Sequence, residues 1–277
     1  TTTSNGLTAF NSDGFNLGSY SSVNNNNDTY VAWCWKAGGT AVSNTDGDVT
    51  ASVSANAAYG FSIVKWTSTS TSGTESVGHG LGKRPAMVIF KERDRSADWY
   101  VWHQSVCDAD TKFLKLNANG GLQSGAGDVW GDLPTESVIN INNGSLNATG
   151  SDNIAYCFAD VPSYQRVGVY TGNGSSTGPV VVTGFQPRWV LIKRTDSAGN
   201  WGIYDTERHA PIDNNLTLLA DTSGAESVDN NKIDIVANGF QPKNSTANIN
   251  ASGGTYIYWA IGDDEIGSDE DCLVDVP

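Results

Sequence analysis

An internal repeat constrains the fold of this chain more than any other feature. The segment Pro85–Trp102 recurs without a gap as Pro187–Tyr204, and Pro, Val, Lys, Asp and Trp occupy the same places in both copies. Two further matches flank this pair in the same order: Ile63–Thr67 with Val167–Thr171, and Asn153–Asp160 with Thr255–Asp263. Three anchors in one order are not a chance agreement. The sequence therefore predicts a self-contained unit of about 100 residues that is built twice.

A partial third copy precedes the two complete ones. Thr29–Trp35 matches the end of each complete copy, and Asn11–Phe15 matches Ala237–Phe240. The alignment gives Cys34, Cys157 and Ala260 one structural position, which favours a small core residue over a redox role. We therefore expect five segments: 1–37 as the C-terminal part of a preceding repeat, 38–59 as a linker or a loosely paired strand, 60–163 and 164–263 as two repeats, and 264–277 as an acidic tail.

The alternation of apolar and polar residues within each copy predicts short β-strands. In the first copy these are expected at Phe61–Thr67, Ala86–Glu92, Trp99–His103, Phe113–Leu116, Ser137–Ile141 and Ile154–Phe158. Segments rich in Gly and Asn separate them, and these residues accept the positive φ of tight turns. This number and spacing of strands predicts an all-β fold of tandem antiparallel β-sandwich repeats, jelly-roll-like in topology.

The charge balance excludes one large class of partners. The net charge is −14, so the chain cannot neutralise a phosphate backbone, and we expect no nucleic-acid partner. No apolar run is long enough to cross a bilayer as a helix, so we expect no membrane insertion. Seven carboxylates and no basic residue follow Gly262, and a like-charged run of this kind is typical of a solvated tail. The alternative is a docking peptide that ends in Cys272–Val274.

A set of motifs gives the chain a family resemblance. They are Asp13–Phe15, Thr29–Trp33, Lys36–Gly39, Gly60–Val64, Gly78–Gly82, Pro85, Tyr170–Gly174 and Asn250–Tyr256. As a set they resemble repeat domains of virion structural proteins of tailed bacteriophages, chiefly tail-fibre-like and other appendage proteins. The resemblance covers nearly the whole chain up to about Asp264. It implies a location on the virion surface or outside the cell, a role in host attachment, and a homo-oligomer, with a trimer as the first expectation. It carries over no catalytic residues.

The residues offer little sign of catalysis. No nucleophile elbow, zinc-protease helix, phosphate-binding loop or dinucleotide fingerprint is present. Three histidines and four cysteines lack the spacing of a metal site, and Asp46–Asp48 and Asp263–Glu265 lack that of a calcium loop. We therefore expect no catalytic residues, no metal and no cofactor. A glycan-cleaving carboxylate pair stays a remote alternative.

Carbohydrate binding is a second, more physical hypothesis, because flat aromatic rings stack on sugars. Trp130 lies in a Gly- and Asp-flanked segment without a counterpart in the second copy, which makes it the first candidate. His79, in a Gly-rich turn, and Trp102 are further candidates. Trp99 and Trp201 are matched repeat positions, and we expect both in a core or between sheets.

The sequence thus predicts a non-enzymatic virion structural module of a fibre-like appendage, which serves host-surface attachment or virion assembly. Its expected partners are other virion proteins and a host-surface glycan or receptor. A capsid decoration protein, and a secreted bacterial adhesin or carbohydrate-binding module, are the alternatives.

Overall fold

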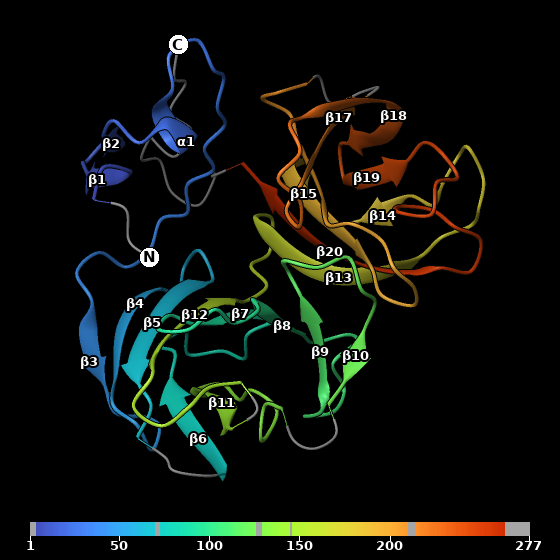
Figure 1. The fold of residues 1–277 in the computed structure, drawn as a ribbon. Coiled ribbons are helices and arrows are strands. Elements are labelled where there is room, and N and C mark those ends of the chain that lie inside the picture. The colour runs from blue at the N-terminus through green and yellow to red at the C-terminus, as the bar shows by residue number, and fades with distance from the viewer. Residues whose placement is uncertain (1–3, 70–72, 126–128, 145, 210–213, 264–277) are drawn as a thin grey trace. The chain divides into compact units, whose positions relative to one another are not determined.

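The structure is a computed structural model that describes residues 4–69, 73–125, 129–144, 146–209 and 214–263. These described residues divide into two compact units, one that ends at Lys36 and one that begins at Ala37. Almost all regular structure is antiparallel β-strand, so the predicted all-β sandwich class is confirmed (Figure 1).

The first unit holds three short elements. Strand β1 (Leu7–Phe10) pairs with β2 (Phe15–Leu17), and helix α1 (Ser21–Asn24) follows. Residues 28–38 contain no strand, although Thr29–Trp35 aligns with a central strand of each complete copy. Cys34 is exposed here. Its expected equivalence with two buried core positions is therefore not met in this structure.

The first complete copy is a sandwich of a large sheet and a small sheet. The large sheet has the order β10-β9-β8-β7-β12-β5-β4-β3. Its strands are β3 (Val42–Asn44), β4 (Ala51–Asn56), β5 (Phe61–Thr67), β7 (Met87–Glu92), β8 (Tyr100–His103), β9 (Lys112–Lys115), β10 (Gln123–Ser124) and β12 (Asp152–Phe158). The small sheet pairs β6 (Gly73–Gly78) with β11 (Val138–Asn143).

One hydrophobic core joins these two sheets. Val64, Phe90 and Cys157 point into it from the large sheet, and Val77 and Ile139 from the small sheet. Period-two alternation places these side chains on one face of each strand. The packing of the small sheet on this face makes the copy a sandwich.

The segment 38–59, expected as a linker or a loosely paired strand, contributes two strands to the large sheet. β3 pairs with β4, and β4 pairs with β5 along five residues, from Ser52 opposite Lys65 to Asn56 opposite Phe61. The small residues of β4 alternate in burial, and Ala51 and Val53 enter the core. Their polar neighbours gave the segment the composition of a linker, but backbone pairing with β5 makes it a strand.

The second copy uses one eight-stranded sheet that packs back on itself, in the order β13-β20-β15-β16-β17-β18-β19-β14. Its strands are β13 (Gln165–Thr171), β14 (Val181–Val182), β15 (Pro187–Arg194), β16 (Gly202–Asp205), β17 (Asn214–Leu219), β18 (Ser227–Val236), β19 (Gly239–Pro242) and β20 (Thr255–Gly262). The ring of Phe240 on β19 lies 5.8 Å from Tyr170 on β13 and 5.3 Å from Tyr258 on β20. The two ends of the sheet therefore enclose a shared core.

Four strands of each copy pair in the same order, β5-β12-β7-β8 in the first and β13-β20-β15-β16 in the second. The registers agree as well. Cys157 lies opposite Ser62 and Val88, and Ala260 lies opposite Arg166 and Val190, which are the aligned residues. These correspondences fit the tandem-repeat interpretation.

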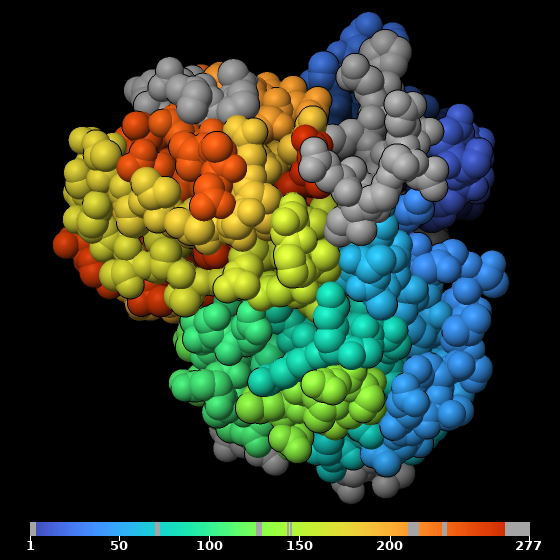
Figure 2. Space-filling model, turned by 180° about the vertical axis from the view of Figure 1, so that it is seen from behind, coloured from blue at the N-terminus to red at the C-terminus, as the bar shows by residue number. Residues whose placement is uncertain are grey.

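Part of the second face of each eight-stranded sheet is also buried. Met87, Ile89 and Val101 point away from the first core, and Leu191 and Ile257 point away from the second, yet all five are buried. Phe158 of the first copy contacts Trp259 of the second, with ring centroids 4.1 Å apart. In Figure 2 the first copy (cyan and green) and the second (yellow and orange) meet along a continuous boundary. The two sandwiches therefore pack large sheet against large sheet.

A clasp of polar contacts secures one side of this junction. The indole Nε1 of Trp201 donates to the Lys115 carbonyl at 2.9 Å, and Lys193 Nζ donates to the Asn119 carbonyl at 3.0 Å. Two backbone hydrogen bonds, from Leu122 N to Thr195 O and from Gly199 N to Asn119 O, add to it. Burial lowers the pKa of Lys193 to about 8. We call these contacts the junction clasp.

Candidate functional site

The three predicted binding residues all lie inside the first sandwich, and the structure corrects this prediction. Trp130 is 2% exposed, and its indole Nε1 donates to the Lys112 carbonyl at 2.9 Å. Trp102 is fully buried in the same core, with the Arg84 guanidinium 5.2 Å from its ring centre. Neither indole presents a ring face that a sugar could reach.

His79 is fully buried as well, and it serves the backbone. Its Nδ1 accepts from the Leu81 amide at 3.2 Å, and its Nε2 lies 3.3 Å from the Thr135 carbonyl. Burial lowers the pKa of the imidazole, which keeps the ring neutral at physiological pH. In this structure the ring of His79 contacts the backbone of the turn between β6 and β7 and does not face solvent.

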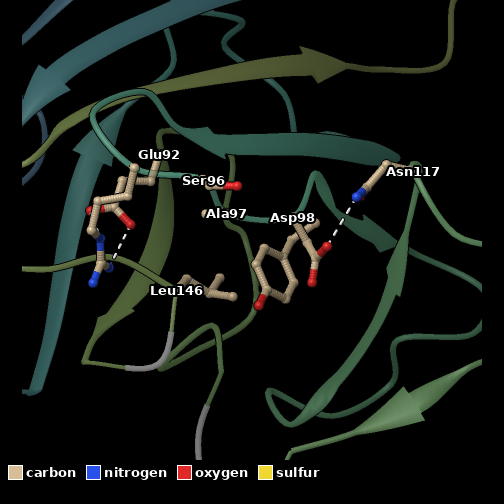
Figure 3. A pocket seen from close by; sticks show the side chains of 8 residues that line it. Glu92, Ser96, Ala97, Asp98, Asn117 and Leu146 are labelled. Atoms are coloured by element: carbon tan, nitrogen blue, oxygen red, sulfur yellow. Dashed lines mark hydrogen bonds and ion pairs between the residues drawn. The ribbon is translucent and has the colours of Figure 1, made fainter.

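The structure points instead to a polar hollow in the first copy, with a volume of about 400 Å³ (Figure 3). We call it the polar pocket. Its lining residues are Glu92, Arg95, Ser96, Ala97, Asp98, Tyr100, Asn117 and Leu146. They come from the end of β7, the loop between β7 and β8, the start of β8, the segment after β9, and the loop between β11 and β12.

Asp98 is the best-held carboxylate of the polar pocket. Lys115 Nζ lies 2.7 Å from one of its oxygens, and Asn117 Nδ2 donates to the other at 2.9 Å. These two bonds, Lys115 first, lower the pKa of Asp98, so the carboxylate is ionised at neutral pH. The Oδ1 of Asn117 accepts from the Trp99 amide at 2.9 Å, which fixes the orientation of the Asn117 amide.

Glu92 forms the second charged pair of the polar pocket. Its carboxylate is fully buried and accepts two hydrogen bonds from Arg95, at 2.7 and 2.6 Å, while Arg95 is largely exposed. This bidentate bond raises the pKa of the Arg95 guanidinium. Lys91 Nζ donates to the carbonyls of Glu92 and Arg95, and so holds the ends of this turn together.

The apolar part of the polar pocket is Tyr100 with Leu146. Both line the polar pocket, where the Tyr100 ring is partly exposed and Leu146 is almost fully buried. Phe113 packs edge-on against the Tyr100 ring at 5.4 Å, and Lys115 Nζ lies 5.7 Å from the ring centre. Both contacts hold the ring in place, so the walls of the polar pocket are preorganised.

The second copy has different residues at the positions that line the polar pocket in the first copy. Gly202 stands at the position of Tyr100, Asn200 at that of Asp98, and Arg194 at that of Glu92. Asp221 takes the place of Asn117, because its Oδ1 accepts from the amide of the matched Trp201. The common fold therefore does not require these four lining residues.

No group of three or more His, Cys, Asp or Glu residues within the described part of the chain could hold a metal ion. Asp46 bonds with Asn44 and Asp48 with Ser76, while the segment Asp263–Glu265 lies mostly outside the described residues. Burial raises the pKa of Cys107 to about 12 and raises that of Cys157 further. Neither thiol is poised to react.

The comparisons with known proteins give one match. Residues 1–264 match a family described as "Domain of unknown function (DUF7483)". No curated protein and no solved structure matches the chain. Among the described residues, no helix is long and apolar enough to cross a membrane.

Proposed function

The chain belongs to the DUF7483 family, and from its own residues we propose that it is a non-enzymatic structural module of a tailed-phage virion surface. In this proposal it forms part of a fibre-like appendage that serves host-surface attachment or virion assembly. Its partners are other virion proteins and a host-surface glycan or receptor, and the assembled form is a homo-oligomer.

The packing of the two large sheets on each other carries this proposal. Buried aromatic rings such as Phe158 and Trp259 fill the junction, and the junction clasp ties its edge. A block of this kind keeps its shape under load, because its two sandwiches share one interior instead of a flexible tether. Rigid, repeated β-modules of this build suit an appendage that transmits contact over a distance.

Charge supports the same proposal. A net charge of −14 keeps an exposed protein soluble and discourages contact with nucleic acid inside a particle. The motif resemblance, from Thr29–Trp33 to Asn250–Tyr256, points to the same class of virion proteins.

Locating the protein in an intact particle tests this proposal. Immunogold labelling with antibodies against the purified chain should decorate tails or fibres, and mass spectrometry of purified particles should detect the chain. Label on DNA-filled heads stripped of tails would favour the capsid decoration alternative. Detection in culture medium of uninfected cells, with none in particles, would overturn the virion assignment and favour a secreted adhesin or carbohydrate-binding module.

A further inference from the structure

We propose that the polar pocket binds one neutral pyranose unit of a surface polysaccharide. The inference deepens the attachment role proposed above and rests on it for the source of the ligand. It uses a different set of residues from the aromatic side chains that sequence patterns favour, since those are buried.

Charge pairing inside the polar pocket favours a neutral ligand. Glu92 is neutralised by Arg95, and Asp98 by Lys115, at N–O distances of 2.6 and 2.7 Å. A charged ligand would therefore replace one member of an ion pair, and the displaced side chain would be left without a counter-charge. A neutral ligand leaves both pairs intact.

Hydrogen-bonding groups of both kinds surround the hollow. A carboxylate has about four lone-pair sites, and the side chains bonded to Asp98 occupy only part of them. Arg95 uses its Nε and one terminal nitrogen on Glu92 and has further N–H donors. Vicinal sugar hydroxyls both donate and accept, so a pyranose matches this mixture of acceptors and donors.

The partly exposed Tyr100 ring supplies a small apolar surface beside these polar groups, to which the buried Leu146 adds little. The C–H face of a pyranose needs such a surface, whereas an inorganic ion does not. The hollow of about 400 Å³ is near the lower end of small-molecule sites, which run from about 300 to 1,000 Å³. Its size therefore suits one sugar ring of a longer chain.

The differences between the copies argue that these residues are present for a ligand. The second copy keeps the backbone cap on its matched Trp201 through Asp221, but it has Gly202 where the first has Tyr100. The sandwich thus forms without the aromatic wall and without the amide donor of Asn117. One weak site in each chain gains strength from several chains in one appendage, because tethering raises the effective concentration.

The experiment uses the full chain and protein-detected NMR. Methyl glycosides of glucose, galactose, mannose, rhamnose and the two N-acetylhexosamines are titrated, with glucuronate and glucosamine as charged probes. We expect at least one neutral glycoside to shift the Asn117 side-chain amide and the backbone amides of Ser96 and Asp98. Charged probes should bind more weakly than their neutral parents.

Three variants sharpen the test. Asp98→Asn and Tyr100→Gly should each weaken binding by about tenfold or more, since each removes a main contact. Asn117→Asp keeps the cap on Trp99, as Asp221 does in the second copy, and should weaken binding while the fold is kept. Asn200→Ala, at the aligned position of the second copy, is the matched control and should bind as the parent does.

Two results would overturn the inference. One is the absence of any shift at the polar pocket with all neutral glycosides, and the other is unchanged binding in folded Asp98→Asn and Tyr100→Gly. Preferential binding of a charged probe would overturn the neutral-sugar assignment. Either failure is distinct from a failure of the virion assignment, because particle labelling does not depend on the polar pocket.

Discussion

His103 is a titratable residue that is buried when the chain folds. It is buried at the junction of the two large sheets, where its ring faces the backbone of Gly168 and Tyr258. Its Nδ1 accepts from the Ser105 amide at 3.2 Å. Burial lowers its pKa from 6.5 to about 4, because the charged form would lose its hydration.

This shift predicts a pH dependence of stability. The unfolded chain protonates His103 near pH 6.5 and the folded protein only near pH 4, so the unfolded state binds more protons between these values. The contribution of neutral His103 to the free energy of unfolding is complete above about pH 6.5. As the pH falls to about 4, up to about 3 kcal/mol of that free energy is lost. His79 acts in the same direction.

The measurement is the free energy of unfolding by urea from pH 7.5 to 4, for the parent and for His103→Gln. The difference between the two should shrink as the pH falls, since Gln does not titrate. A constant difference across this range would contradict the assigned role of His103.

The cysteines give a second prediction at this scale. Cys34 is exposed, whereas Cys107 and Cys157 are buried with raised pKa values. In a Cys272→Ser variant, a thiol reagent should modify one cysteine rapidly under native conditions and the other two only after unfolding. Mass spectrometry of the peptides identifies the site. Rapid labelling of Cys157 would contradict its place in the first core.

The residue scale also shows why sequence patterns missed the candidate site. Trp130 has the neighbours of an exposed loop residue, but its indole turns inward to a backbone carbonyl. Asp98 and Asn117 are ordinary loop residues, and only the fold brings them to 2.9 Å. The replacement of Tyr100 by Gly202 between the copies was the available signal, because it marks a position that the repeat itself does not need.

Single elements were predictable where apolar alternation was strong. β5, β8 and β12 lie within two residues of their predicted positions. β3, β4 and β6 were not predicted, because small polar residues dominate them and their pairing partners supply what their composition does not. The run Met87–Phe90 is apolar without alternation, which is typical of a strand buried on both faces.

The junction clasp predicts unequal effects for two matched tryptophans. Trp201→Phe removes the indole donor to the Lys115 carbonyl, which keeps only a longer bond from the Ala118 amide, and it leaves a gap at a fully buried site, so it should cost about 1–3 kcal/mol. Trp99→Phe, at the aligned and half-buried position of the first copy, should cost clearly less. Urea denaturation of both variants measures the difference. Equal losses would contradict the asymmetry of the clasp.

At the scale of the whole molecule, two sandwiches of similar build act as one body. Sequence patterns predicted two successive modules, because periodicity shows which strands are buried and not what covers them. The described residues from Ala37 onward form one compact unit, and the burial of part of the second face of each eight-stranded sheet explains why. The sequence could not predict that the two sheets pack on each other, since a local pattern shows that a face is buried but not which surface covers it.

The pairing of the large sheets is most directly tested by calorimetry of the parent and of Val64→Ala. Val64 lies in the first core, away from the junction, and its truncation should destabilise the first sandwich by about 1–3 kcal/mol. We predict a single transition for both sandwiches in the parent, and in the variant a single transition at a lower temperature. Two transitions in the parent, with only one of them at a lower temperature in the variant, would contradict the packing of the two sandwiches as one unit.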